Sequence, residues 1–234
     1  MGYPIDQIGV NTRLFSIIGA NAIEKKQDTF FNNAFQQLDV DCKMMPLNIR
    51  EDDLGFFLNG LKDSKIEGAF LDSEYWKPVY DLLHEGNDEV QRCGICDTIT
   101  IANSGYNVEV VQGRATLDCV NKLCDISGKN ILIVGDTPSS KSFLWHLVKT
   151  NPAKILLAAH EIEMLRDFVS LIPEHIKCDV IRIQNNKIEE KSDISIDFTN
   201  ANIISESQYH LDFTQDFNKI LEKIAKIKTK EWSV

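Results

Sequence analysis

The chain has 234 residues, of which 43% are hydrophobic and 26% charged, the composition of an ordinary globular protein. This length allows one large domain or two smaller ones, each with its own core. The net charge of −10 at pH 7 would repel a phosphate backbone, which argues against nucleic-acid binding. No apolar run reaches the roughly 18 residues of a membrane span, and no secretory signal precedes Arg13. We therefore expect a cytoplasmic protein without a membrane partner.

The six cysteines favour reduced thiols over a disulfide framework, because no secretory signal accompanies them. Cys93 and Cys96 form a C-x-x-C pair that could supply a zinc site together with Cys119 and Cys124. The second pair, however, is separated by four residues, and both pairs lie in apolar patterns that suit buried cysteine. We therefore expect no metal site.

The first half of the chain alternates between strand-like and helix-like patterns. Apolar runs predict strands at 14–19, 42–47 and 68–71, and helical spacing of apolar residues predicts helices at 30–38, 52–61 and 78–84. This order predicts a mainly parallel sheet with helices on its faces. An Asn103-Ser104-Gly105 turn then predicts a β-hairpin between 98–102 and 108–111.

The second half restarts this alternation. Strands are predicted at 131–134, 154–158, 178–183 and 194–198, and helices at 115–123, from Ser139 onward and at 161–171. This pattern predicts a Rossmann-like unit. An amphipathic helix follows at 216–228, and we expect its apolar side to pack against a domain.

The turn after the strand at 131–134 is a candidate phosphate site. It runs from Gly135 to Ser142 and enters a helix, the context in which backbone N–H groups hold a phosphate. The dinucleotide fingerprint G-x-G-x-x-G has Thr137 and Ser140 in place of its later glycines, and Pro138 removes a donor. The segment also approaches the P-loop pattern G-x-x-x-x-G-K-[ST]. Weak phosphate or nucleotide binding and a purely structural turn are both open.

Several segments, taken in order, resemble motifs of the shikimate dehydrogenase family. They are FSIIG at 15–19 with NNAF at 32–35, which resemble YAVIGNPIxHSxSPxxHNxxF; GICDTI at 94–99, which resembles GAVNTI; KNILIVG at 129–135, which resembles KxVLVLG; and DISIDFT at 193–199, which resembles DLVINAT. Gly113 keeps one glycine of NTDGxG. The resemblance extends over residues 13–200 and rests on the order and spacing of these motifs.

The resemblance implies an α/β fold of two lobes, an N-terminal mainly parallel substrate-type domain and a Rossmann-like NAD(P)-type domain. We expect residues 1–100 to form the first and 101–211 the second, with a C-terminal helix within 212–234 packing back on the first. The implied cofactor is NADP or NAD, although the missing glycines also allow none. The expected cofactor-binding residues are Gly135, Thr137, Ser139, Ser140 and His160. His160 lies where the family has the arginine that selects the adenosine 2′-phosphate.

The resemblance also locates the residues that surround shikimate in the family. The two serines of the opening loop correspond to Lys25 and Gln27, the asparagine to Asp97 and the aspartate to Gln112. The lysine that moves a proton corresponds to Trp76, so Lys77, one residue later, is the candidate catalytic residue. The expected substrate-binding residues are Lys25, Gln27, Asp72, Asp97 and Gln112.

These replacements favour a shikimate dehydrogenase-like protein with lost or altered dehydrogenase activity, a pseudoenzyme that binds a small polar metabolite between its lobes. One alternative is an active NAD(P)-dependent oxidoreductase of the family with another substrate and Lys77 as proton carrier. Another is a P-loop-like nucleotide binder that uses Lys141 and Ser142. A third is that the charged residues are solvated loop residues facing an unused cleft. The expected assembly is a homodimer.

Overall fold

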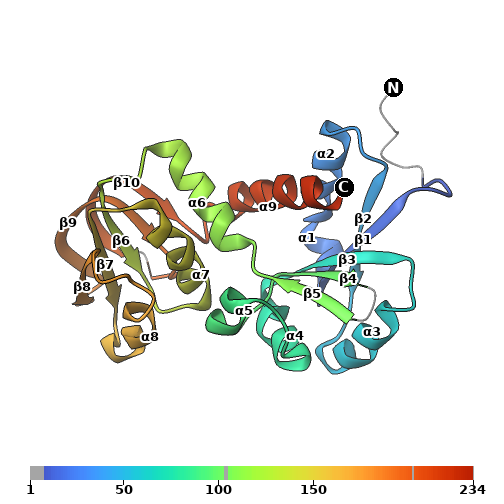
Figure 1. The fold of residues 1–234 in the computed structure, drawn as a ribbon, viewed down its shortest axis with the longest axis horizontal. Helices are drawn as coiled ribbons and strands as arrows, with labels where there is room; N and C mark the ends of the chain where they lie inside the picture. Colours follow the sequence, from blue (N-terminus) through green and yellow to red (C-terminus); the bar gives the residue numbers. More distant parts are fainter. Residues whose placement is uncertain (1–7, 103–104, 202, 234) are drawn as a thin grey trace. The chain divides into compact units, whose positions relative to one another are not determined.

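The structure is a computed structural model that describes residues 8–102, 105–201 and 203–233. The chain forms two compact units, Met1–Val111 with Ile224–Val234 (unit 1) and Gln112–Lys223 (unit 2). Each unit contains one five-stranded sheet with helices packed against it (Figure 1). The α/β class with two parallel-rich sheets is therefore confirmed, while the domain boundaries at residues 100 and 211 stay a prediction.

Sheet A, in unit 1, has the strand order β2-β1-β3-β4-β5. Its strands are β1 (Arg13–Gly19), β2 (Cys42–Asn48), β3 (Ile66–Leu71), β4 (Thr98–Ala102) and β5 (Gly105–Glu109). β1 pairs in parallel with β2 and β3, whereas β4 is antiparallel to both β3 and β5. The predicted parallel core and the predicted hairpin are confirmed. The turn residues Asn103 and Ser104 lie outside the described residues.

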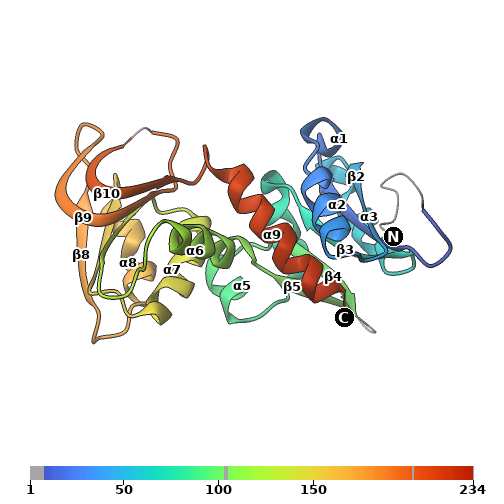
Figure 2. The same cartoon turned by 90° about the horizontal axis from the view of Figure 1, so that it is seen from above.

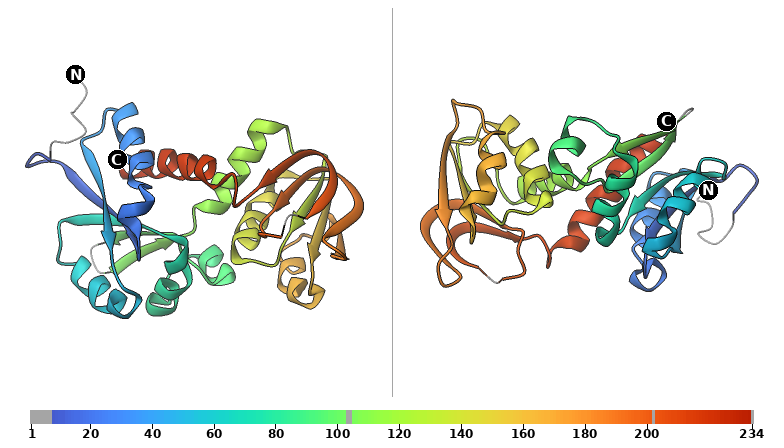
Figure 3. Two further views of the ribbon diagram at one scale, coloured as in Figure 1. Left: turned by 180° about the vertical axis from the view of Figure 1, so that it is seen from behind. Right: turned by 90° about the horizontal axis from the view of Figure 1, so that it is seen from below.

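Helices cover both faces of sheet A. They are α1 (Ala22–Lys25), α2 (Asp28–Gln37), α3 (Leu54–Leu61), α4 (Trp76–Leu83) and α5 (Asp88–Cys93), with 3-10 turns at η1 (Glu51–Asp53) and η2 (Ser73–Tyr75). The chain moves outward from β1 to β2 and then back past β1 to β3, so right-handed crossovers place α2 and α3 on opposite faces. Phe31 of α2 accordingly packs on Phe70 of β3. On the other face α3 and α4 lie side by side (Figure 3).

The C-terminal helix α9 (Phe217–Trp232) ends in unit 1 and contacts sheet A (Figure 2). The ring of Trp232 stacks on Phe15 with 4.2 Å between centroids, and its indole N–H donates to Oγ1 of Thr100 at 3.2 Å. Lys228, whose side chain is only 2% exposed, pairs with Glu109 of β5 and with Glu231 at 2.7 Å. Aromatic stacking and a buried cation therefore hold the end of the chain on sheet A.

Sheet B, in unit 2, is parallel throughout, in the order β10-β9-β6-β7-β8. Its strands are β6 (Asn130–Val134), β7 (Lys154–Ala159), β8 (Lys177–Arg182), β9 (Lys187–Asp197) and β10 (Ile204–Asp212). The helices are α6 (Gln112–Leu123), α7 (Pro138–Leu147) and α8 (Arg166–Val169), with 3-10 turns η3 (Val148–Thr150) and η4 (Ile162–Leu165). Counted from β6, the strand order is 5-4-1-2-3, which matches five strands of the Rossmann order.

Unit 2 departs from the sequence-based expectation at two places. The helix predicted at 161–171 was wrong in extent, because this segment forms only η4 and α8. Strand β10 was not predicted, and β9 begins seven residues earlier than its predicted start at 194. The segment 198–203 that joins β9 to β10 is far shorter than the usual helical crossover. Both strands curl accordingly (Figure 2).

Helices α6 and α7 pack closely at Gly113, the glycine shared with the family motif. A Cβ added there would lie 2.5 Å from the carbonyl carbon and 2.6 Å from the carbonyl oxygen of Ser142. We expect Gly113→Ala to lower the free energy of unfolding by about 2 kcal/mol, because forced separation of the helices outweighs the helix preference of alanine. Urea denaturation followed by circular dichroism measures this. Asn121→Ala, at an exposed position of α6, is the control, and a loss no larger than the control's contradicts the prediction.

Candidate functional site

The strand order of sheet A reverses between β1 and β3, and open α/β sheets bind ligands outside the carboxyl ends of their strands at such a point. The backbone N–H of Asp72 donates to the carbonyl of Ile18 at 2.8 Å, which places Asp72 beside Gly19. A Cβ on Gly19 would lie 2.8 Å from Cβ and 2.9 Å from Oδ2 of Asp72. Glycine at the end of β1 therefore makes room for a carboxylate.

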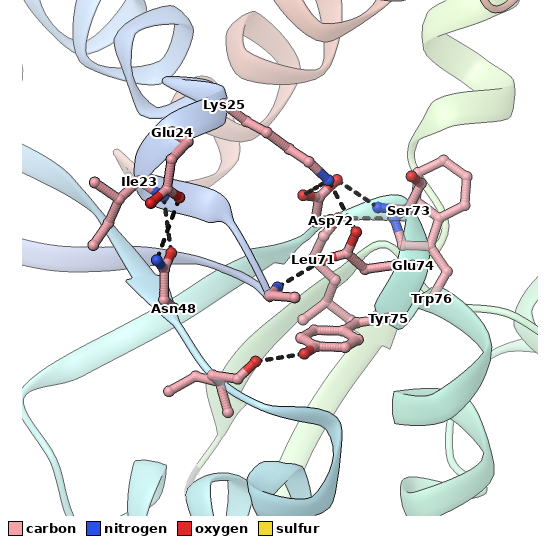
Figure 4. A network of polar contacts seen from close by, with 12 residues as sticks. Ile23, Glu24, Lys25, Asn48, Leu71, Asp72, Ser73, Glu74, Tyr75 and Trp76 are labelled. Carbon is pink, nitrogen blue, oxygen red and sulfur yellow. Dashed lines mark hydrogen bonds and ion pairs between the residues drawn. The ribbon is translucent and has the colours of Figure 1, made fainter.

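Lys25, Asp72 and Glu74 form an ion-pair network at this edge (Figure 4). The Lys25 ammonium donates to Oδ2 of Asp72 and, at 2.9 Å, to Oε2 of Glu74. Each carboxylate also accepts a backbone N–H, Glu74 from Ala20 at 2.6 Å and Asp72 from Ser73 at 2.9 Å. The Asp72 side chain is 3% exposed, whereas those of Lys25 and Glu74 are 36% and 35% exposed. The network thus presents one cation and two anions, partly open to solvent.

The network shifts the titration of both exposed partners. Burial lowers the pKa of Lys25, but its hydrogen bonds to Asp72 and Glu74 raise the pKa more, and the net value lies above the ordinary one. Burial raises the pKa of Glu74, but the hydrogen bonds from Lys25 and Ala20 lower the pKa further. At neutral pH the ion pair is therefore fully charged.

Replacing Lys25 by methionine is expected to cost about 1 kcal/mol of unfolding free energy at pH 7, because it leaves the buried Asp72 carboxylate without its cation. Because the pKa of Glu74 is lowered in the folded protein, the ion pair stabilises the fold above the unfolded carboxyl pKa of about 4.3. This stabilisation is lost as the pH falls through the pKa of Glu74 in the folded protein. Because the pKa of Lys25 is raised in the folded protein, the same stabilisation is fully present below the unfolded lysine pKa of about 10.4. It is lost only as the pH rises past the pKa of Lys25 in the folded protein. Thermal denaturation from pH 3 to pH 9 checks both signs. A loss that is unchanged at pH 3 contradicts the assignment.

The matched control is Lys77→Met, at the predicted catalytic lysine. Lys77 is 62% exposed, pairs with Asp81 one helical turn later, and lies 5.7 Å from the ring centre of Tyr80. Exposed pairs of this kind contribute little, so the variant is expected to change stability by less than about 0.5 kcal/mol. The described contacts of Lys77 do not include the Lys25 network.

Trp76 stands where the resemblance puts the proton-moving lysine. Its side chain is buried, its indole N–H donates to the carbonyl of Leu71 at 2.8 Å, and its own carbonyl accepts the N–H of Cys96 at 3.1 Å. The first bond joins the start of α4 to the end of β3, and the second joins it to the segment before β4. An indole at this position packs and orients the backbone, and it has no proton to exchange near neutral pH.

The other predicted substrate residues have different environments. Asp97 is fully buried, and both of its carboxylate oxygens accept the N–H of Val111, at 2.9 and 2.8 Å. Oε1 of Gln27 is buried and accepts no hydrogen bond from the described residues. Gln112 is fully buried at the first position of α6, in unit 2. Of the predicted set, the structure brings Lys25 and Asp72 into direct contact.

Two participants were missed from the sequence. Glu74 is the second carboxylate that binds the Lys25 ammonium. Asn48, at the end of β2, accepts the N–H of Ile23 at 3.0 Å and donates to Glu24 at 3.3 Å (Figure 4). A usable signal existed for Glu74, because the acidic pair Asp72 and Glu74 directly follows a predicted strand. Asn48 follows the neighbouring strand in the same way.

The corresponding point of sheet B lies between β6 and β9. Gly135, at the end of β6, has φ +107°, and a Cβ there would lie 3.0 Å from Cγ2 of Thr199 and 3.5 Å from Cβ of Phe198. Thr199 is held by Asp197, which accepts its backbone N–H and its hydroxyl, both at 2.7 Å. The residues that follow β9 therefore pack against the start of the turn. This contact was not predicted, although Thr199 ends the DISIDFT motif.

In the turn between β6 and α7, Ser140 makes its hydrogen bonds within the turn. Oγ1 of Thr137 caps the helix by accepting the N–H of Ser140 at 3.2 Å. The buried hydroxyl of Ser140 lies 2.9 Å from the carbonyl of Gly135 and 2.7 Å from that of Thr137, so its proton stays within the turn. Pro138 has no N–H to offer. Ser139 is half-buried beside it.

The remaining predicted nucleotide contacts lie on other surfaces. His160 is exposed after β7, and its carbonyl accepts a hydrogen bond from Arg182 at 3.3 Å. Lys141, which a P-loop would aim at phosphate, lies 3.6 Å from Asp167 and 5.9 Å from the ring centre of Phe168. Ser142 is fully buried on the side of α7 that meets α6. The geometry gives no support to the P-loop alternative.

Three of the four cysteines considered for a zinc site, Cys93, Cys96 and Cys119, are buried, and Cys124 is half-buried. Cys93 and Cys96 are buried in unit 1, whereas Cys119 and Cys124 belong to unit 2. Burial raises the pKa of the Cys96 and Cys119 thiols, which disfavours the thiolate form that a zinc ion needs. In the described part of the chain, no three His, Cys, Asp or Glu side chains are grouped as metal ligands. Nor does any helix there combine the length and apolarity needed to cross a membrane.

Among known proteins, the chain is similar in sequence to shikimate dehydrogenases. The NADP(+)-type shikimate dehydrogenase of Prochlorococcus marinus is 22% identical over 196 residues, covering 81% of this chain and 67% of the relative. That of Pyrococcus furiosus is 24% identical over 201 residues, covering 79% and 72%. The match to the Methanosphaera stadtmanae enzyme spans only 52% of that relative's length. No family model matches the chain.

Solved structures agree in fold. Shikimate 5-dehydrogenase from Listeria monocytogenes, in complex with shikimate and NAD, superimposes with a TM-score of 0.70 at 12% identity, covering 97% of this chain and 91% of that one. A shikimate dehydrogenase in complex with NADP+ gives 0.67 at 14% identity, covering 97% and 98%. The chain therefore resembles shikimate dehydrogenases in sequence, at low identity, and shares the fold of their solved structures. An Ael1 enzyme from Pseudomonas putida shares the fold, with a TM-score of 0.78 at 10% identity over 94% of this chain and 92% of that one.

Proposed function

We propose that this chain is a shikimate dehydrogenase-like protein whose dehydrogenase reaction is lost or altered, and that it binds a small polar metabolite at the carboxyl edge of sheet A. The observation that carries the proposal is the buried indole of Trp76 at the position where the resemblance puts the proton-moving lysine. A proton carrier must reach the reacting hydroxyl and exchange its proton near working pH. Trp76 does neither.

Neither Lys77 nor Lys25 is suited to act as the proton carrier in place of the family's lysine. Lys77 is exposed and paired with Asp81. Lys25 lies at the edge of sheet A where the strand order reverses between β1 and β3. Its pairing with Asp72 and Glu74 raises its pKa, so it keeps its proton at neutral pH. An ammonium that keeps its proton is a hydrogen-bond donor and a poor base. Lys25 is therefore suited to binding.

The dinucleotide that the family implies does not fit the turn at Gly135. Its pyrophosphate needs bare backbone and free N–H groups at the start of α7. Thr199 and Phe198 crowd Gly135, Pro138 lacks an N–H, and that of Ser140 is taken by Thr137. Asp136, exposed in the same turn, would repel a phosphate. We therefore assign no step of a reaction to NAD or NADP in this chain.

The charges at sheet A indicate the class of ligand. Asp72 and Glu74 offer acceptor oxygens to hydroxyl or ammonium groups, and Lys25 offers a donor to a carboxylate or hydroxyl. A small metabolite that carries groups of both signs matches this mixture better than an anionic ligand, because the network has one more negative than positive charge. Asp72, Lys25 and Glu74 are the proposed ligand-binding residues.

A spectrophotometric assay tests the loss of the reaction. Shikimate or quinate with NADP+ or NAD+ is expected to give no absorbance change at 340 nm above the enzyme-free rate, for the wild type and for Lys77→Ala alike. The alternative of an active oxidoreductase that uses Lys77 requires turnover that Lys77→Ala removes. Shikimate oxidation by the wild type at an ordinary kcat of about 1 s⁻¹ or more would overturn the proposal.

Calorimetric titration with small amino acids and amino polyols tests the binding site. Loss of one charge-assisted contact in Lys25→Met is expected to weaken binding about tenfold, with Lys77→Met unchanged. Equal affinities in both variants would place the ligand elsewhere.

A further inference from the structure

Helix α1 carries Lys25 on a single turn that cannot support itself. It spans only the four residues Ala22–Lys25, and the side chain of Asn21 does not cap it in the described part of the chain. An isolated turn of helix is unstable in water, because fixing its backbone dihedrals costs more than its few hydrogen bonds contribute. Ala22 is buried, whereas Ile23 is 53% exposed. Apart from the small side chain of Ala22, the position of α1 therefore depends on its polar contacts.

Asn48, the last residue of β2, makes two of these contacts. Its Oδ1 accepts the N–H of Ile23 at 3.0 Å, and its Nδ2 donates to Oε2 of Glu24 at 3.3 Å. The amide oxygen thus faces a donor and the amide nitrogen an acceptor, which determines the orientation of the amide. The N–H groups of the first turn of a helix have no partner within the helix. Asn48 therefore supplies the partner that the N–H of Ile23 lacks.

Asn48 is itself held at the end of sheet A. It is paired with Gly19 in the parallel register of β1 and β2, and the N–H of the next residue, Ile49, donates to the carbonyl of Gly19 at 3.0 Å. On the other side of β1, Asp72 follows β3 and lies beside Gly19. Helix α1 is therefore tied to the end of β2 by Asn48, and to the end of β3 by the ion pair of Lys25 with Asp72.

Glu24 gives the contact with Asn48 a second consequence. Glu24 and Lys25 are neighbours in the sequence and carry opposite charges. The Glu24 carboxylate turns toward Asn48, whereas the Lys25 ammonium extends toward Asp72 and Glu74 (Figure 4). A Glu24 carboxylate released from the amide would compete for the ammonium, because opposite charges attract. The amide of Asn48 thus leaves Lys25 to the site.

We propose that Asn48 is a positioning residue, which holds α1 in place and thereby keeps the Lys25 ammonium against Asp72 and Glu74. Asn48 affects a ligand only through Lys25, and this part of the inference rests on the proposed function. Asn48 is exposed, so its hydrogen bonds compete with water and each contributes modestly. The loss of Asn48 therefore has a smaller effect on binding than the loss of Lys25.

A double-mutant cycle of melting temperatures at pH 7 tests this role without a ligand. The drop in Tm caused by Lys25→Met is expected to be at most about half as large in the Asn48→Ala background as in the wild type, because the ion pair is already loosened there. Asn107→Ala, at an exposed position of β5, is the matched control and should leave the drop unchanged. Strictly additive changes in Tm for Asn48→Ala and Lys25→Met would overturn the proposal.

An exchange of groups separates positioning from simple packing. Asn48→Asp keeps the size of the side chain and the acceptor for Ile23, but it brings two carboxylates together at Glu24. It should therefore reduce the effect of Lys25→Met as Asn48→Ala does. Addition of Glu24→Gln to Asn48→Asp supplies a donor from the helix and should restore the full effect, while Glu24→Gln alone should resemble the wild type. A combined variant that is no closer to the wild type than Asn48→Asp would overturn the proposal.

Calorimetric titration with L-serine and D-glucosamine, one small amino acid and one amino sugar, gives the second readout. Asn48→Ala is expected to weaken binding about fivefold in the wild type, the loss for one ordinary hydrogen bond, and to change nothing in Lys25→Met. Coupling in the melting cycle with no binding to the wild type would refute the proposed function and leave the positioning of Lys25 supported. An equal loss of affinity in both backgrounds would show that Asn48 does not act through Lys25, and would overturn this inference alone.

Discussion

Trp232→Ala is expected to lower the free energy of unfolding by about 3–4 kcal/mol. The Trp232 ring stacks on Phe15, lies 6.1 Å from the ring of Phe31 and donates to Thr100. Its removal leaves a cavity between α9 and sheet A and an unpaired hydroxyl beside it. Urea denaturation followed by far-UV circular dichroism measures the loss without depending on tryptophan fluorescence.

The control for this change is Lys230→Ala, at an exposed position two residues earlier in α9. It should alter stability by less than about 0.5 kcal/mol. If Trp232→Ala costs under about 1 kcal/mol, the end of α9 does not hold unit 1 together as described.

Lys228→Met is expected to cost about 2–3 kcal/mol, because Glu109 and Glu231 then face each other without the cation between them. Lys228 is 2% exposed, whereas Glu109 and Glu231 are 29% and 38% exposed, so the loss falls short of that for a fully buried pair. Chemical denaturation at pH 7 gives the value.

The double variant Glu109→Gln with Lys228→Met provides the second arm of this test. Removing charge from both partners should recover part of the loss, since the remaining groups no longer repel. Losses that add without any coupling would show that Lys228 acts only by packing.

The predictable parts of the fold are the elements whose apolar residue types indicate that they are buried. β6 and β1 are apolar along most of their length and buried, and apolar runs of this kind identify strands. β10 is an edge strand with the sequence ISESQYHLD and mostly exposed or half-buried side chains, so no apolar period distinguishes it from a loop. In the segment predicted as a helix at 161–171, Met164 and Val169 are 62% and 41% exposed, so part of its apolar pattern never faced the core.

The site was predictable as a set of positions and much less as a set of contacts. The resemblance pointed to Lys25 and Asp72, but their contact depends on the parallel register of β1 with β3, which pairs Ile18 with Leu71. Glu74 lies two residues before Trp76, but it was not among the predicted substrate-binding residues. The packing of Thr199 on Gly135 likewise joins residues more than sixty positions apart, and only the pairing of β6 with β9 brings them together.

Titration of the protein with NADPH and with NADH tests whether the turn after β6 binds a dinucleotide. In the proposed function, the turn from Gly135 to Ser140 does not accept a pyrophosphate. We therefore expect no saturable binding of either dinucleotide up to about 1 mM, as measured by calorimetry and by cofactor fluorescence. Saturable binding with a dissociation constant below about 100 μM would contradict it.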